Sequence, residues 1–290
     1  KKYGITIPEY EVDFGKTVKR SRDVSNRLSK GIEFLMKKND ITHLSGRGIL
    51  KSPNKIEVTS GKKKEIVEAK KIIIATGARP KIFPGMESDG KQVITSKEAM
   101  VLKEPPKKMV IIGAGAIGAE FAYFYNEYGT EIHLIEMMPN ILPIEDEDIS
   151  KELEKILKKQ GINIMTSAEL IESKANDDSV KVKIKNSKDE IIEFEANVVL
   201  SAVGIKSNIE NIGLENIGIK VQNDKISVDD FYKTNVEGFY AIGDVVSGPA
   251  LAHVASAEGI TCVENIKGLN TSTIDYNNIP GCTYCKPEIA

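Results

Sequence analysis

Residues 109–136 combine a motif of three closely spaced glycines, a helix and a terminal acid in an order that suits dinucleotide binding. An apolar run enters Gly113-x-Gly115-x-x-Gly118, a helix-period segment follows, and a second apolar run ends at Glu136. Gly113 permits a tight turn, Gly115 lets the backbone approach a pyrophosphate, and Gly118 lets the helix pack close to the strand. The phosphates would accept hydrogen bonds from free N–H groups at the helix N-terminus. The alternative, a glycine-rich turn that binds nothing, is disfavoured by the complete strand, helix, strand and acid arrangement.

The carboxylate of Glu136 also indicates which dinucleotide would bind. An acid at this strand end can accept hydrogen bonds from the hydroxyls of an adenosine ribose, whereas a 2′-phosphate would be repelled and would require an arginine. Met137, Met138 and Pro139 follow Glu136, with no cation beside them. We therefore expect NAD(H) in preference to NADP(H).

A second pattern of this kind lies further along the chain. An apolar strand from Phe239 to Ile242 runs into Gly243 and Asp244, which places the acid at a strand end, where α/β sheets bind ligands. Residues 248–253 then open a helix whose N-terminus would favour negative charge on a ligand. Taken alone, these residues could equally form a strand–turn–helix corner in which Asp244 caps the helix.

The elements that must position these residues alternate between strands and helices, which predicts an α/β fold. Residues 13–38 have the periodicity of one amphipathic helix, with Val24, Leu28, Ile32 and Leu35 on its apolar face. The helix after Gly113 would place its own apolar face at Ile117, Phe121, Phe124 and Tyr128. Further strands are predicted at 41–44, 55–59, 65–69, 70–75, 162–165, 180–184, 191–194 and 198–204.

Two groups of residues are of types that can bind metals or carry out redox chemistry. The acidic run 145–148 precedes a predicted helix, 149–160, and complements its dipole; a cation site would need further converging oxygens, so we expect no metal. Cys282 and Cys285 form a C-x-x-C, which can be a redox pair or half of a zinc site. No second pair is present, and Pro287 follows closely, so we interpret these cysteines as buried strand residues.

Composition narrows the class of protein. With 290 residues the chain is long enough for about two domains. Its net charge of −2 and evenly spread cations give no sign of a nucleic-acid or membrane partner. No apolar run is long enough to span a bilayer, and the first residues contain no signal-peptide core. Three cysteines do not form a disulfide framework, so we expect a reducing, cytoplasmic compartment.

The motifs together resemble the flavin disulfide reductase family, and within it the dihydrolipoamide dehydrogenase branch. The segments that carry the resemblance are IATGARP, VIIGAGAIGAEF, LIEMMPNILPIEDEDI, LKKQGINI, IGLENIGI, YAIGDVV, GPALAHVASAEGI and DYNNIPGCTYCKPEIA. The resemblance implies two nucleotide-binding domains of Rossmann-like type, with an NAD domain inserted in a partial FAD domain. The implied ranges are 1–104 and 229–274 for FAD, 105–228 for NAD, and 275–290 for the start of an interface domain.

The resemblance also implies which residues would contact each cofactor. Those expected to hold NAD are Gly113, Ala114, Gly115, Ala116, Ile117, Gly118, Ala119, Glu120, Glu136, Leu170 and Gly204. Those expected to hold FAD are Gly48, Thr76, Gly77, Ala78, Asp244, Ala250, Leu251, Ala252 and His253. One departure is the segment after Gly204, where Ile205 stands at the position of the family's arginine, so this chain lacks that guanidinium there.

The family's Cys-x4-Cys pair, its first FAD turn and its acid–base His and Glu do not occur in these residues. We therefore expect an internal fragment, without catalytic residues of its own and inactive alone, of a homodimeric enzyme. That enzyme would pass electrons from a lipoyl dithiol through a disulfide and FAD to NAD, within 2-oxo acid dehydrogenase complexes. Two alternatives stay open: a flavin disulfide reductase with another substrate, and a nucleotide-binding module without catalysis.

Overall fold

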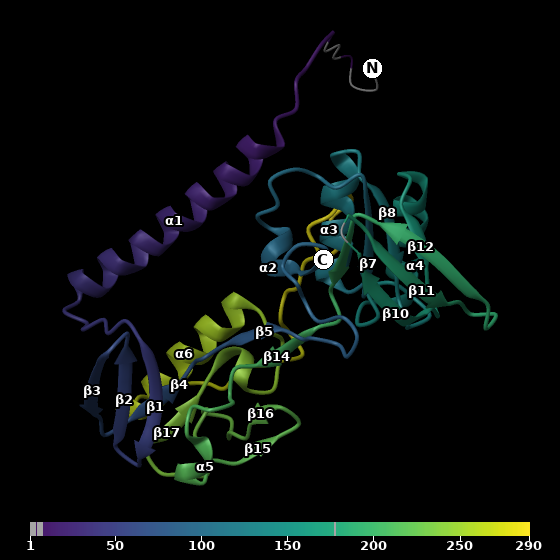
Figure 1. Ribbon diagram of the computed structural model, residues 1–290. Helices are drawn as coiled ribbons and strands as arrows, with labels where there is room; N and C mark the ends of the chain where they lie inside the picture. Colours follow the sequence, from purple (N-terminus) through teal and green to yellow (C-terminus); the bar gives the residue numbers. More distant parts are fainter. Residues whose placement is uncertain (1–3, 5–7, 177) are drawn as a thin grey trace. The chain divides into compact units, whose positions relative to one another are not determined.

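The computed structural model describes residues 4, 8–176 and 178–290, which form two compact units (Figure 1). The first unit comprises the described residues up to Asp40 together with Pro80–Gly204 and Cys282–Ala290. The second comprises Ile41–Arg79 and Ile205–Gly281. The unit around the Gly113 turn thus runs from 80 to 204, whereas the sequence placed a domain at 105–228. The shift arises because a strand at 93–95 joins its sheet and residues 205–207 pair elsewhere.

A parallel five-stranded sheet forms the centre of the first unit, which confirms the predicted α/β class. Its strand order is β6-β13-β7-β8-β9, and every pairing is parallel. An antiparallel sheet, β10-β11-β12, accompanies it. The strands are β6 (Val93–Thr95), β13 (Val198–Ser201), β7 (Lys108–Ile112), β8 (Glu131–Ile135), β9 (Asn163–Met165), β10 (Glu169–Ala175), β11 (Val180–Lys185) and β12 (Ile191–Ala196). The sequence had not predicted β6 or β10.

The two faces of the parallel sheet are covered by different elements, as the alternating side chains of β7 show. Met109 and Ile111 pack with helices α3 (Ala116–Glu127) and α4 (Glu147–Lys159). Val110 and Ile112 pack with the antiparallel sheet. Because successive strand side chains point to opposite faces, an uninterrupted apolar strand is needed to fill both layers. The helix of one short turn, α2 (Ser96–Ala99), follows β6 and has a capping box.

The buried face of α3 differs from the predicted one. Its fully buried positions are Gly118, Ala119, Ala122 and Tyr125, mostly small residues that let the helix lie close to the sheet. Phe121, Phe124 and Tyr128 are partly buried and pack at the edge of the same core. Hydrophobicity alone predicts that the large residues are the most buried. The close approach of the helix to the sheet instead places the small residues deepest in the core.

Helix α1 (Phe14–Lys38) begins where the sequence predicted, but its apolar face is exposed. Asp13 caps it by accepting a hydrogen bond of 2.9 Å from Lys16 N. Phe14 is buried and packs edge-on against Tyr128, with ring centroids 5.0 Å apart. Further along, Leu28, Ile32 and Leu35 are 65%, 55% and 49% exposed. The helix itself is confirmed, and its apolar face is largely uncovered in the described part of the chain, because periodicity indicates an apolar face without indicating what covers it.

The second unit is built from small sheets around its own core. A parallel pair, β4-β17, lies at its centre, and the buried residues around it include Leu50, Ile72 and Phe239. The elements are β1 (Arg47–Ser52), β2 (Lys55–Ser60), β3 (Lys63–Glu68), β4 (Ile72–Ile74), β5 (Ala78–Pro80), β14 (Ile205–Ser207), α5 (Leu214–Ile217), β15 (Val221–Gln222), β16 (Lys225–Ile226), β17 (Phe239–Ala241), the 3₁₀ helix η1 (Gly243–Val245) and α6 (Ala252–Lys267).

One predicted strand in this unit is wrong. Residues 41–44 are not in a strand; the first strand is β1, which pairs antiparallel with β2. The sequence favoured 41–44 for its apolar side chains, but pairing and turn geometry put Arg47 and Gly48 in the sheet instead. None of the helices in the described part of the chain is long and apolar enough to cross a membrane.

We predict that Gly118→Ala lowers the free energy of unfolding by roughly 1–3 kcal/mol or more, because overpacking a core usually costs this much. A Cβ at Gly118 would lie 1.9 Å from the carbonyl oxygen of Gly113, whereas a Cβ at Gly31, also in a helix, would meet nothing within 4 Å. Gly31→Ala is therefore the control and should raise stability by up to about 1 kcal/mol. Thermal or urea unfolding checks both, and equal effects of the two substitutions would contradict the packing described here.

Candidate functional site

The turn between β7 and α3 uses its three glycines for different reasons. Gly113 has φ +99°, and a Cβ there would lie 2.5 Å from the carbonyl oxygen of Ala202. Gly118 packs against the turn itself, as described above. Gly115 has an ordinary φ of −69° and open space where a Cβ would be. The protein's own packing thus requires Gly113 and Gly118, and leaves the space beside Gly115 free for a ligand.

Glu136 lies directly after β8 and is 7% exposed. Its Oε2 accepts a hydrogen bond of 2.6 Å from Ala114 N, and its Oε1 accepts one of 2.8 Å from Met138 N. The carboxylate therefore holds the glycine turn in place from the neighbouring strand. The sequence predicted Glu136 as a partner of a ribose, and each carboxylate oxygen keeps further acceptor capacity for that role.

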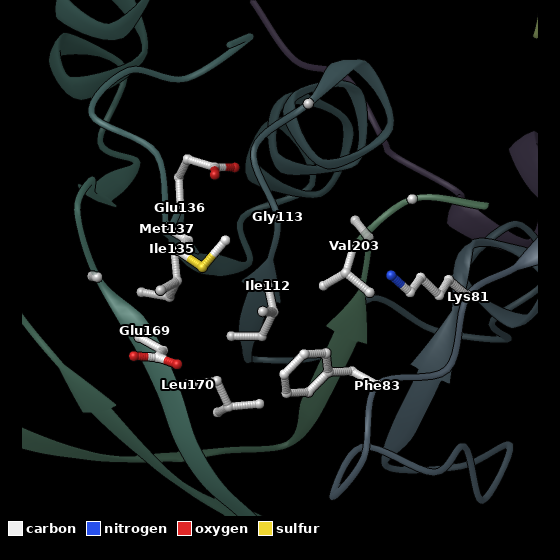
Figure 2. Close-up of a pocket in the computed structure, with 14 residues that line it drawn as sticks. Lys81, Phe83, Ile112, Gly113, Ile135, Glu136, Met137, Glu169, Leu170 and Val203 are labelled. Atoms are coloured by element: carbon white, nitrogen blue, oxygen red, sulfur yellow. The ribbon is translucent and has the colours of Figure 1, made fainter. Parts of the chain in front are cut away.

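A cavity of about 390 Å³ opens over the carboxyl ends of β7, β8 and β13 (Figure 2). Of the residues predicted for NAD, it is lined by Gly113, Gly115, Glu136, Leu170 and Gly204. The residues that sequence reasoning missed are Lys81, Phe83, Ile112, Ile135, Met137, Ala168, Glu169, Ala202 and Val203. Most of these continue strands already recognised, but Lys81 and Phe83 come from a segment without any motif. Lys81 is placed there through its backbone N–H, which donates to Gly204 O at 2.9 Å.

The remaining predicted NAD residues do not line this cavity. Ala114, Gly118 and Ala119 are buried in the turn and in the core, so their part is to shape the backbone. Ala116 and Ile117 lie in the first turn of α3. Glu120, on the same helix, accepts a hydrogen bond of 2.8 Å from Tyr284 N. The structure thus brings Glu120 together with the C-terminal segment of this unit.

The second unit has a polar cavity of about 650 Å³. Gly48 and Thr76, both predicted to contact FAD, line it together with Arg47, Arg79 and Asn208 among others. The Thr76 Oγ1 donates to Asn208 O at 2.7 Å, and the Asn208 amide donates to Thr76 O at 3.0 Å. Gly77 accepts from Asn208 N through its carbonyl oxygen at 2.8 Å. The predicted Gly77 and Ala78 are thereby fixed against residues 205–208.

Arg79 holds the segment where the family's arginine is missing. Its guanidinium donates to Ser207 O at 3.1 Å and to the Asn208 side chain at 2.9 Å, and it pairs with Glu210 at 2.9 Å. These contacts hold the turn after Gly204 from the opposite strand. The Arg79 and Lys206 side chains together lower the pKa of Glu210 to about 2.

The other predicted FAD residues follow β17. Asp244 lies in η1, and its backbone carbonyl accepts from Ser207 Oγ at 2.9 Å and from Lys225 Nζ at 2.6 Å. Ala250 is exposed, Leu251 is the N-cap of α6, and Ala252 is its first residue. The His253 ring is 2.9 Å from Pro280 O. The predicted contacts therefore lie along one short stretch from a strand end to a helix N-terminus.

Residues 4–259 match the family described as pyridine nucleotide-disulphide oxidoreductase. This chain belongs to that family. It is 41% identical to a dihydrolipoyl dehydrogenase of Rhizobium etli, covering 100% of this chain and 64% of that protein. It is also 41% identical to one of Zymomonas mobilis, covering 99% and 62%.

Two solved structures illustrate the shared fold. LpdA from Mycobacterium tuberculosis superimposes with a TM-score of 0.89 at 24% identity, covering 97% of this chain and 62% of that one. The flavoprotein disulfide reductase RclA from Escherichia coli, in a Cu(II) complex, gives 0.87 at 25% identity, covering 96% and 63%. This chain thus spans 62–64% of the length of these relatives.

The oxidoreductase family and its dihydrolipoyl dehydrogenases use FAD and NAD, and the residues present fit both. For NAD, the open space at Gly115 and the carboxylate of Glu136 meet in one cavity. For FAD, the Asp244 peptide is fixed through its carbonyl, while its carboxylate takes none of the hydrogen bonds found among the described residues. The contacts of individual residues with either cofactor stay predictions.

The three cysteines of the chain are free thiols. Cys285 is buried in the core of the first unit, and burial raises its pKa to about 11. Burial also raises the pKa of Cys282, with further contributions from the Glu288 and Glu120 carboxylates. A redox C-x-x-C normally has a lowered thiol pKa, so these directions agree with the expectation of structural cysteines.

We predict slow alkylation of Cys285 at neutral pH. A rise from the usual 9.0 to about 11 lowers the thiolate fraction roughly a hundredfold, and the thiolate is the reactive species. Iodoacetamide labelling followed by mass spectrometry, repeated from pH 7 to pH 10, should show a rate that still increases above pH 9. Cys282, which is less buried, serves as the internal comparison. Rapid labelling of Cys285 that levels off below pH 8 would favour a redox-active pair.

Proposed function

We propose that this chain carries the NAD site and part of the FAD site of a dihydrolipoamide dehydrogenase. The observation that carries the proposal is the cavity over the Gly113 turn, which has open space at Gly115 and the Glu136 carboxylate in its wall. Identities of 41% to dihydrolipoyl dehydrogenases over nearly the whole chain support this substrate class. The partners would be a lipoyl dithiol, free or on a 2-oxo acid dehydrogenase complex, and a second subunit of the enzyme.

Bound FAD and NAD would supply the redox chemistry, taking electrons from a dithiol and passing them on as hydride. The residues of this chain would bind and orient. The N-terminus of α3 would bind the NAD pyrophosphate, Glu136 would accept from the adenosine ribose, and Leu170 and Gly204 would enclose the dinucleotide. Asp244 would accept from the ribitol hydroxyls of FAD, and the backbone of 250–253 would meet its pyrimidine edge.

Another flavin disulfide reductase is the second candidate, supported by the superposition on RclA. The two candidates share both nucleotide sites and differ in the residues that receive the substrate. The identity of 41% to dihydrolipoyl dehydrogenases, against 25% to RclA, favours the first. Steady-state assays of the protein produced from its native gene, with dihydrolipoamide and with alternative thiols, separate them.

We predict that the chain binds NADH on the order of tenfold or more tightly than NADPH. A 2′-phosphate would approach the buried Glu136 carboxylate, whose hydrogen bonds come from backbone N–H groups rather than from a cation, and such an uncompensated charge costs several kcal/mol. Isothermal titration calorimetry with both nucleotides measures the ratio. Glu172→Gln is the matched control: Glu172 is an exposed acid of the same unit that does not line the cavity, so the ratio should not change. Equal affinities of the wild-type chain for the two nucleotides would contradict the assignment of Glu136.

We predict that Asp244→Ala lowers flavin occupancy while NADH binding persists. The carboxylate is the part of Asp244 left for a ligand, and the substitution keeps the backbone carbonyl that Ser207 and Lys225 bind. Loss of hydrogen bonds to a charged group should weaken FAD binding roughly tenfold. The measurement is the ratio of flavin to protein absorbance after purification of the native-gene protein. Asp230→Ala, an exposed acid in the same unit, is the control; normal flavin content in Asp244→Ala would count against the role.

A further inference from the structure

A buried carboxylate lies behind the turn that carries Asp244. Glu258, on α6, is 2% exposed. Its Oε2 accepts from Gly243 N at 2.5 Å, and its Oε1 accepts from the Tyr276 hydroxyl at 2.7 Å. No ion pair of Glu258 occurs among the residues that the structure describes. A carboxylate buried without a cation destabilises a protein unless its oxygens are hydrogen-bonded, so these two donors are what keep Glu258 in place.

The tyrosines extend this contact in a defined direction. The Tyr276 hydroxyl lies 3.0 Å from the hydroxyl of the buried Tyr232. Because Tyr276 gives its only proton to Glu258, Tyr232 must donate to Tyr276. Burial, together with these two hydrogen bonds, raises the pKa of Tyr276, so both hydroxyls keep their protons at neutral pH. Glu258, Tyr276 and Tyr232 thus form one hydrogen-bonded chain, which we call the brace.

The brace contacts the segment between β17 and α6 at two places, Gly243 near its start and Gly248 in its second half. At the first place Glu258 holds Gly243, which has φ +71° and would bring a Cβ to 3.3 Å from Ala255 Cβ on α6. At the second place the Tyr276 ring packs against Gly248, where a Cβ would lie 2.8 Å from the ring atom Cε1. Asp244 and Ala250 lie within this segment or at its end, and α6 starts directly after it.

We propose that the brace sets the position of residues 243–251 and thereby determines how tightly the protein holds its flavin. Glu258 is then a positioning residue: it acts through the Gly243 peptide and touches no cofactor. The inference rests on the proposed function for the identity of the ligand, FAD. The hydrogen bonds themselves and their effect on the segment are independent of that function.

The test combines hydrogen exchange with flavin binding. In Glu258→Gln the single carbonyl oxygen can accept from only one of the two donors, so the amides of 243–251 should exchange about tenfold faster or more. The FAD dissociation constant of the native-gene protein should rise by a similar factor, and the visible circular dichroism of the bound flavin should change. Tyr276→Phe, which removes one hydroxyl, should give a smaller effect in the same direction. The double variant should fall short of the sum, because the two changes act on the same hydrogen-bonded chain.

Glu264→Gln is the matched control, since Glu264 is on the same helix and accepts instead from Thr271 Oγ1 at 2.8 Å; it should leave exchange and FAD affinity unchanged. NADH affinity should be unchanged in all variants. If Glu258→Gln fails to fold, Tyr276→Phe carries the same test. Unchanged exchange at 243–251 would overturn the brace. Faster exchange with unchanged FAD affinity would overturn its role in flavin binding. A wild-type protein that takes up no FAD would contradict the proposed function itself, and that role with it.

Discussion

The arrangement of the first unit depends on one close approach, that of α3 to the turn that precedes it. Gly118 packs directly on the carbonyl of Gly113, and Gly113 packs on the backbone that follows β13. This contact fixes where the first N–H groups of α3 point and leaves the cavity above the strand ends. A helix with a larger residue at 118 would have to move outward, and the small buried face of α3 at Ala119 and Ala122 would lose its packing against the sheet.

In both units, a turn near the end of a strand is held by a hydrogen bond to a buried glutamate. Each has a glycine with positive φ within two residues of the end of a buried strand, Gly113 after β7 and Gly243 after β17. In each, a buried glutamate from a neighbouring element accepts a backbone N–H of that turn, Glu136 from Ala114 and Glu258 from Gly243. A turn that must present its backbone to a ligand cannot be held by its own side chains. A carboxylate distant in sequence supplies the missing hydrogen bond.

The sequence predicted most of what local physics determines, including the β7–α3–β8 unit, the strand before Gly243 and the α/β class. It was wrong where tertiary contacts decide. Residues 41–44 are not a strand, and periodicity did not indicate whether the apolar face of α1 would be covered. In the candidate NAD site, glycine spacing located the turn and Glu136, but Lys81 and Phe83 reach the cavity only through the path of a loop. No pattern in the sequence predicted the brace either, because Glu258 looks like an ordinary acidic residue on a helix surface.

The three glycines of the turn between β7 and α3 would be retained for different reasons during evolution. Gly113 and Gly118 are required by atoms of the protein itself, so selection for a folded chain retains them whatever the protein binds. Gly115 faces open space and has an ordinary backbone conformation, so only a ligand demands it. A descendant that gave up nucleotide binding would be free to drift at position 115 alone. Its turn would then still look intact while its function had gone.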